Sequence, residues 1–192
     1  DCDGDGSLLL TELYAEPFVD LSGLYLGCAD LSFADLFAAN LSDSNLSGAN
    51  LEGGYLPDAD LTGADLRNAD LTNANLSGAD LSFAILFEAD LTNANLFGVR
   101  SGGVVGTPNV LPTEWNLRSG YLIGPGANLS GANLSGVDLT NVNLSGADLT
   151  NADLTNAILT NANLTGADLT NADLTGADLR NCLLYTSPSP RD

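Results

Sequence analysis

The chain has 192 residues, enough for one domain or one continuous repeat array, and carries 25 Asp and Glu against five Arg, with no Lys or His, for a net charge of −20. This charge repels nucleic-acid phosphates and argues against direct DNA or RNA binding. No stretch is long and apolar enough to cross a bilayer, so membrane insertion is not expected. The three cysteines are too few for a disulfide framework and lack metal-ligand spacing.

Residues 1–18 begin with DCDGDGSLLLTE, which matches the calcium loop of an EF-hand. Asp1, Asp3 and Asp5 supply oxygen ligands at alternating positions, Gly6 permits the sharp turn, and Glu12 is the bidentate candidate. No entering helix and no second loop accompany the motif, so an acidic turn that caps the first coil is the alternative. A Ca²⁺ site here would favour an extracellular or periplasmic setting.

Residues 19–98 form a five-residue repeat. Leu recurs at every fifth position from Leu21 to Leu96, and the same period resumes from Leu129 to Leu179, giving 27 leucines in all. Ala stands two residues earlier in 21 cases, and the residue between them is Asp or Asn in 23. Leu and Ala are too abundant and too regularly placed for a disordered tract.

The period of five excludes simple helices and strands. On an α-helix the leucines would spiral around every face, and on a flat strand they would alternate between two sides. A chain that turns a corner every five residues points each Leu towards a common axis, with Ala also inward and Asp or Asn outward. Each buried Leu then contributes about 1.5–3 kcal/mol, and the Ser, Thr, Asn and Gly that follow are typical corner residues.

Stretches such as ADLTNANLSGADL resemble the pentapeptide-repeat family, whose pattern is A-(D/N)-L-X-X. The resemblance implies an all-β fold, a right-handed quadrilateral β-helix with four pentapeptides in each coil. It also implies bacterial origin. The sequence predicts two such blocks, residues 19–98 and 127–181, separated by a looped-out hairpin insert.

The insert, residues 99–126, is marked by Gly and Pro at both ends. Residues 115–118 and 121–123 are predicted to be short strands around Ser119-Gly120. Trp115 and Tyr121 could serve a recognition loop, but lone aromatic residues more often pack against the body of the protein. We expect packing.

Residues 182–192, CLLYTSPSPRD, depart from the repeat. They resemble a translated transposase-type sequencing adapter, so we expect an artefact of library preparation and exclude them from functional reasoning.

No catalytic residues stand out, because the outward Asp residues recur at every turn and no asymmetric pocket is indicated. We therefore expect a non-catalytic structural or protein-interaction scaffold with an acidic solenoid surface, a protein partner of unknown identity and an unknown oligomeric state. No cofactor is expected apart from the possible Ca²⁺. The alternative follows from the resemblance: some family members are acidic rods that mimic B-DNA and modulate DNA gyrase. A weaker possibility is an ice- or crystal-binding face, since Thr recurs at every fifth residue from Thr150 to Thr175.

Overall fold

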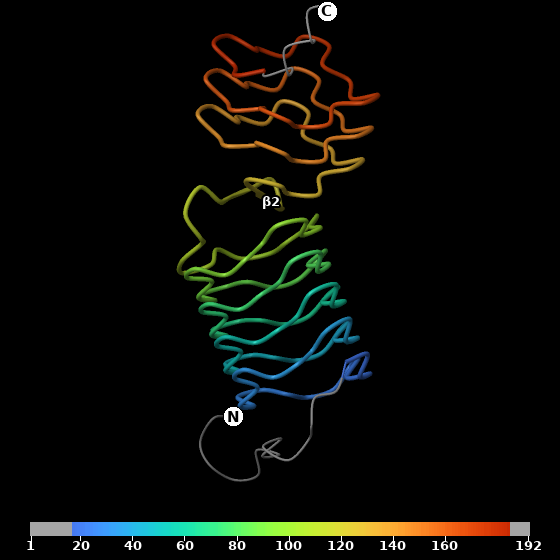
Figure 1. Cartoon of the computed structure of the whole chain (residues 1–192), viewed down its shortest axis with the longest axis vertical. Coiled ribbons are helices and arrows are strands. Elements are labelled where there is room, and N and C mark those ends of the chain that lie inside the picture. The colour runs from blue at the N-terminus through green and yellow to red at the C-terminus, as the bar shows by residue number, and fades with distance from the viewer. Residues whose placement is uncertain (1–16, 185–192) are drawn as a thin grey trace, which may run out of the picture.

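The computed structural model describes residues 17–184, and these residues form an all-β solenoid without any helix. Parallel bridges join residues twenty apart, beginning with Asp20 to Asn40 and continuing along the chain. Twenty residues are four pentapeptides, so each coil has four sides. The molecule is a right-handed quadrilateral β-helix, elongated along the stacking direction (Figure 1).

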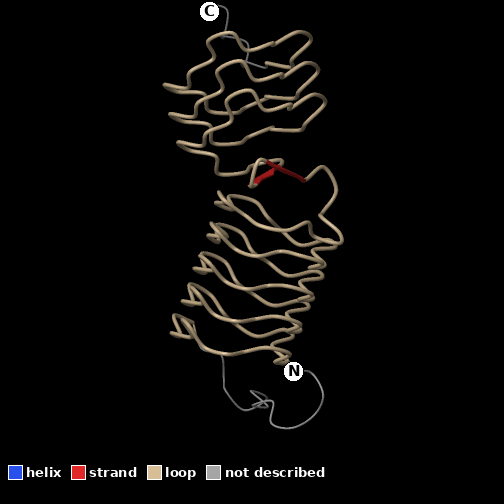
Figure 2. Ribbon diagram, turned by 180° about the vertical axis from the view of Figure 1, so that it is seen from behind, coloured by secondary structure: helices blue, strands red, loops and turns tan. Residues whose placement is uncertain are grey.

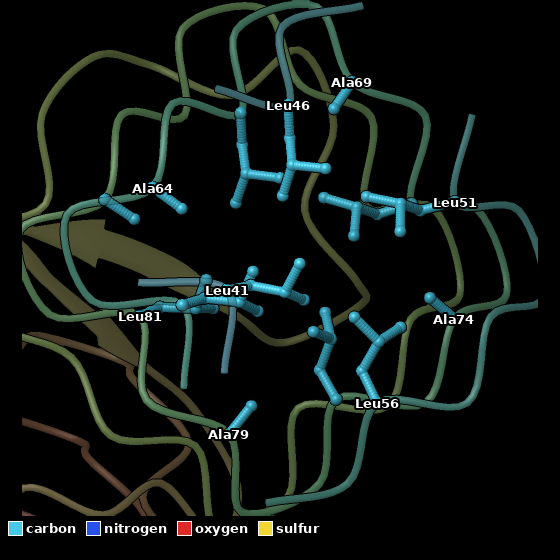
Figure 3. Close-up of a cluster of buried hydrophobic side chains, with 14 of the residues drawn as sticks. Leu41, Leu46, Leu51, Leu56, Ala64, Ala69, Ala74, Ala79 and Leu81 are labelled. Atoms are coloured by element: carbon cyan, nitrogen blue, oxygen red, sulfur yellow. The ribbon is translucent and has the colours of Figure 1, made fainter. Parts of the chain in front are cut away.

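The inward residues are the Leu and Ala of the repeat. Leu41, Leu46, Leu51 and Leu56 point towards the axis from successive sides of one coil and are fully buried (Figure 3). The inward Ala residues fill the space beside them and are equally buried in mid-stack. The predicted fold class and inward register are therefore confirmed.

Every backbone N–H of a regular pentapeptide has a partner, as Ala59 to Gly63 illustrates. The N–H of Asp60 donates to the preceding coil, those of Leu61 and Gly63 donate to the next coil, and that of Ala59 closes the corner turn. The N–H of Thr62 donates instead to the Oδ1 atom of Asp60, at 2.9 Å. An Asp or Asn at the outward position thus satisfies the one N–H group that neither a neighbouring coil nor the corner turn reaches.

Proline stands two residues after two of the outward positions that lack this side-chain acceptor. Tyr55 stands at an outward position and is followed two residues later by Pro57; Val110 is followed in the same way by Pro112. Because proline has no N–H, these two corners need no acceptor. Pro57 is also the second residue of the turn from Leu56 to Ala59, a position that suits the fixed φ of proline.

The corners place their third turn residue at positive φ, which favours Gly and Asn. Phe33 and Phe83 nevertheless occupy this position, with φ of 57° and 61°. Their rings lie against Gly53 and Gly103, each twenty residues later, where an added Cβ would come within 2.4 and 2.6 Å of ring atoms. A large side chain at a corner is therefore matched by a glycine on the next coil.

The stack continues past the last leucine of the first block. Val105 and Val110 still bridge to the coil twenty residues before them, and Arg100 bridges both Asp80 and Asn128. The spacing from Arg100 to Asn128 is 28 residues instead of twenty. We call residues 100–127 the irregular coil.

The irregular coil contains the only named strands of the described residues, β1 (Asn116–Arg118) and β2 (Tyr121–Ile123). They pair antiparallel, with Leu117 opposite Leu122 (Figure 2). The predicted hairpin is therefore confirmed, but the expectation that it is looped out is wrong. It packs between the two blocks: Leu122 belongs to the core of the first block, Ile123 to that of the second, and both are fully buried.

Two hydroxyl groups replace backbone partners beside the hairpin. The N–H of Leu122 donates to Ser101 Oγ at 2.9 Å, and the N–H of Asn133 donates to the Tyr121 hydroxyl at 3.1 Å. In regular coils the N–H at the position of Asn133 donates to a carbonyl of the preceding coil. Side chains thus complete the hydrogen bonding where the coil geometry is interrupted.

Candidate interaction surface

The four sides of the solenoid carry different outward residues, and we name them faces A to D in chain order. Face A presents Asp20, Asn40, Asp60, Asp80, Arg100, Asn128, Asp148 and Asp168. Face B presents Tyr25, Asn45, Asp65, Ile85, Val105, Asn133, Asp153 and Asp173. Face C presents Asp30, Asn50, Asp70, Asp90, Val110, Asp138, Ile158 and Asp178. Face D presents Asp35, Tyr55, Asn75, Asn95, Asn143, Asn163 and Leu183.

The negative charge is unevenly distributed among these faces. Faces A and C carry five outward Asp each, face B carries three, and face D carries only Asp35. Face D instead has asparagine ladders, in which Asn95 donates to Asn75 at 3.1 Å and Asn163 donates to Asn143 at 3.2 Å. The solenoid is therefore not a uniformly acidic rod.

The outward carboxylates are structural hydrogen-bond acceptors. A Ser or Thr hydroxyl and the backbone N–H of the same residue lower the pKa of a group of them, namely Asp20, Asp30, Asp138, Asp168 and Asp173. Hydrogen bonds from the Arg180 side chain, and then from its backbone, lower the pKa of Asp178 to about 2. These shifts extend the ionised range of the groups to more acidic pH.

One apolar cluster interrupts the polar exterior, and we call it the break patch: Phe83, Ile85, Phe87 and Val105. Ile85 and Val105 occupy consecutive levels of face B and form a parallel bridge. Phe83 and Phe87 lie at the two corners that flank Ile85. Phe83, Val105 and Phe87 are 66%, 58% and 48% exposed, so the patch presents apolar surface next to the irregular coil.

Arginine gathers around the same levels. Of the four arginines in residues 17–184, Arg67, Arg100 and Arg118 lie between the third coil and the hairpin. Arg67 stands one coil before Phe87 and pairs with Asp65, its Nε lying 2.8 Å from Oδ1. Arg100 is exposed on face A at the level of Val105. Three of the four arginines in this part of the chain therefore lie near the levels of the break patch.

A second aromatic cluster provides a natural comparison, because SFAILF at residues 82–87 repeats SFADLF at residues 32–37. In the earlier copy Phe37 packs edge-on against Phe18, with ring centroids 5.5 Å apart, and stacks on Tyr55 at 6.3 Å. Asp35 replaces the apolar Ile85 at its centre. The earlier copy therefore keeps a carboxylate amid its rings, whereas the break patch is wholly apolar.

The aromatic residues predicted as a possible recognition loop are engaged within the stack. Trp115 contacts the cores of both blocks and lies against Gly124, where an added Cβ would come within 2.4 Å of the indole. Tyr121 packs on the second core and accepts the hydrogen bond from Asn133. Both side chains are half-buried.

The predicted calcium ligands Asp1, Asp3, Asp5 and Glu12 lie outside the described residues, so this site stays a prediction. Within residues 17–184, no three His, Cys, Asp or Glu side chains are grouped so that they could hold a metal ion. No helix in this part of the chain is long and apolar enough to cross a membrane. The threonines from Thr150 to Thr175 occupy all four corners in turn, so they form no single face.

The break patch was missed in the sequence because the leucine pattern stops at Leu96. Counting on in fives would have found it: inward positions fall at Ser101 and Gly106, and the outward position between them falls at Val105, twenty residues after Ile85.

Comparison with protein families gives one matching model, described as pentapeptide repeats in eight copies. It matches residues 18–53, 44–82, 64–100, 126–156 and 147–184. The comparison with curated protein sequences gives no significant match.

Several solved structures of pentapeptide-repeat proteins resemble the chain. HetL, from the cyanobacterium Nostoc sp. strain PCC 7120 and involved in regulating heterocyst differentiation, is 31% identical, with 87% of this chain and 85% of HetL covered and a TM-score of 0.37. Trypsin-treated QnrB1, a plasmid-mediated fluoroquinolone resistance protein, is 19% identical, with 89% and 92% covered and a TM-score of 0.52. Rfr23, from the cyanobacterium Cyanothece 51142, is 21% identical, with 93% and 97% covered and a TM-score of 0.27.

Proposed function

This chain belongs to the pentapeptide-repeat family, and we propose that it is a non-catalytic protein-interaction scaffold that binds its partner through the break patch. One observation carries the proposal: Phe83, Ile85, Phe87 and Val105 form a wholly apolar cluster, whereas the outward positions of the solenoid are mostly Asp and Asn and the cluster around Phe33 includes Asp35. Exposed apolar patches of this kind typically mark contacts with other proteins.

The backbone at the patch supports a binding role. Phe83 holds a positive φ of 61° while two thirds of its side chain stays exposed. An Asn or Gly would adopt this conformation at lower cost. The aromatic ring gains little from burial within the chain, so contact with a partner would supply the missing stabilisation.

The DNA-mimic alternative is less well supported. A gyrase-binding rod needs a continuous acidic track to match a basic DNA channel. At the level of the irregular coil, the outward residues of faces A, B and C are Arg100, Val105 and Val110, so the acidic columns are interrupted there. The likeness to QnrB1 at 19% identity concerns the fold alone.

The proposal is tested with a pair of matched variants. Phe83→Asn/Phe87→Ser removes the rings of the break patch, and Phe33→Asn/Phe37→Ser makes the same changes in the related hexapeptide. Proteins retained from an extract of the source cells by the immobilised chain would be quantified by mass spectrometry. We expect a specific partner to be lost with the first variant and kept with the second. Equal recovery by both variants would contradict the proposal.

A further inference from the structure

We propose that a disulfide bond joins Cys28 to Cys2 within the chain, and that this bond holds residues 1–16 as a cap over the N-terminal end of the stack. The bond and the cap are independent of the break patch and of the proposed function. Two observations carry the proposal: the state of the cysteines, and the unequal burial of the two ends of the stack.

The cysteines of the chain are not equivalent. Cys28 is disulfide-bonded, whereas Cys182 has a free thiol, which donates to the carbonyl oxygen of Leu159. These two cysteines belong to the first and the last coil, at opposite ends of the stack (Figure 1). Because the chain has only three cysteines, Cys2 is the one that remains to complete the bond.

Cys28 lies at the corner between faces B and C of the first coil, where a bond can form without entering the core. Its side chain is half-buried, and its φ is 57°. The N–H of Cys28 donates to the carbonyl of Ser47 in the next coil at 2.9 Å, which fixes the corner. A disulfide bond requires Cα atoms within about 7 Å of each other. The bond therefore brings the start of the chain to this corner.

The two ends of the stack are buried to different extents. No coil precedes the first one within residues 17–184, yet its inward leucines are only 5–6% exposed, namely Leu21, Leu26 and Leu31. The inward leucines of the last coil are only partly buried, namely Leu169, Leu174 and Leu179. Pro17 and Phe18 are both exposed, so they do not account for this difference. We infer that the preceding residues do.

The N-terminal segment has the composition that a cap needs, because residues 8–10 are three consecutive leucines. Such side chains suit the open end of a Leu and Ala core. The same end also presents backbone groups. The N–H groups of Asp30 and Asp35, whose counterparts in later coils donate to the preceding coil, have no such coil to donate to within residues 17–184. An uncovered edge of this kind invites pairing with another chain.

Formation of the bond is a two-electron oxidation. The thiols of Cys2 and Cys28 lose two protons and two electrons, and a disulfide oxidant such as oxidised glutathione accepts them and is cleaved to two thiols. The bond persists where the surroundings are oxidising, as in the periplasm or outside the cell. We therefore expect the chain to function in such a compartment.

Peptide mapping tests the connection. The full chain would be purified without reductant, exposed to oxidised glutathione and cleaved with a Glu-specific protease. Cleavage after Glu12 and Glu52 places Cys2 and Cys28 on different peptides. Mass spectrometry should find residues 1–12 joined to residues 13–52, and reduction should release them. Non-reducing electrophoresis should show a monomer, which confirms that the bond lies within one chain.

Thermal melting tests the cap. We expect reduction with dithiothreitol to lower the melting temperature of the wild type by roughly 5–10 °C, because the segment is then no longer held over the end. Cys182→Ser should keep the linked peptides and show the same loss. Cys2→Ser and Cys28→Ser should melt at the lower temperature and should not respond to reduction. Cys2→Ser is the cleaner variant, since it changes none of residues 17–184.

The absence of the linked peptides from the oxidised wild type would overturn the proposal, as would a covalent dimer on non-reducing electrophoresis. Linked peptides whose reduction leaves the melting temperature unchanged would also overturn it, because the segment would then be tethered without covering the end. None of these results affects the test of the break patch, which compares variants with intact cysteines.

Discussion

A regular coil such as residues 59–78 and the irregular coil at residues 100–127 meet the same physical demands by different means. In the regular coil, Leu and Ala fill the interior, and outward Asp or Asn accept the N–H groups that the neighbouring coils leave. In the irregular coil, Leu122 and Ile123 of β2 fill the interior, and the hydroxyls of Ser101 and Tyr121 replace backbone partners.

The difference shows which features the solenoid requires and which it can exchange. A filled interior and satisfied N–H groups persist through the break, but the outward acid or amide does not. Val105 and Val110 replace it at two successive sides. The same interruption that brings in the hairpin therefore exposes apolar surface, and the candidate interaction site lies where the repeat is least regular.

The largest expected effect is at an inward position of a regular coil. Leu71 is fully buried, so Leu71→Asp would bury an unpaired charge and should destabilise the fold by about 3–5 kcal/mol or more. Asp70→Asn keeps an Oδ1 acceptor for the N–H of Thr72 and should be nearly silent. Thermal melts of the two variants measure the contrast; equal tolerance would contradict the inward register.

The next largest loss of stability is expected when a core side chain of the irregular coil is shortened. Leu122 is fully buried in the core of the first block, so Leu122→Ala should cost about 2–5 kcal/mol. Ser119→Asn at the exposed hairpin tip, where φ is 49°, should change stability by less than about 0.5 kcal/mol. Urea unfolding would compare them. A silent Leu122→Ala would mean that the hairpin does not pack between the blocks.

A smaller loss of stability is expected when the outward hydrogen-bond acceptor of a regular coil is removed. The irregular coil lacks this acceptor at Val105 and Val110. Asp60→Ala leaves the N–H of Thr62 without its side-chain acceptor and should cost about 0.5–1.5 kcal/mol. Asp60→Asn retains the acceptor and should stay close to wild type in urea unfolding. If both variants lose the same stability, the charge of Asp60 matters and its hydrogen bond to the backbone does not.

The regular coils were predictable from the sequence because one period dictates the whole arrangement. A Leu at every fifth residue can be buried as a set only if the chain turns a corner at that spacing, so the core followed directly. The hairpin was also predictable, because Ser119-Gly120 separates two short segments that each contain large apolar residues. Both predictions depend only on residues that lie close together in the sequence.

The break patch was harder to find because the leucine pattern stops at Leu96, although the five-residue count continues to Val105, twenty residues after Ile85. Ser101 and Gly106 occupy inward positions normally held by Leu, and they hide the continuing register. The placement of the hairpin was equally hidden. Adjacent apolar residues such as Leu122 and Ile123 suit a projecting loop as well as a segment packed between two cores.

The Asp178–Arg180 pair near the end of the stack should make the stability of the chain depend on pH in the acidic range. The folded-state pKa of Asp178 is about 2, below its ordinary value of 3.8. Its contribution is therefore fully present above about pH 4 and is lost as the pH falls towards 2. The difference in melting temperature between wild type and Asp178→Asn should shrink over this range. If the difference in melting temperature stays constant from pH 5 to pH 2, the ionised form of Asp178 does not contribute to stability.

The smallest expected effect is on DNA gyrase, and it separates the scaffold from the DNA mimic. A mimic must present carboxylates continuously along the rod, because its electrostatic match to a basic channel depends on the charge of every level. Here face D carries one outward Asp, and the irregular coil substitutes Arg100, Val105 and Val110 on the other three faces. The hairpin packs within the stack and does not project from it, so the interrupted charge is the feature that disfavours a DNA mimic. We expect no inhibition of gyrase supercoiling at micromolar concentrations of the chain. Salt-sensitive inhibition that disappears when several outward Asp of faces A and C are changed to Asn would reverse this conclusion, since those two faces hold most of the acidic columns.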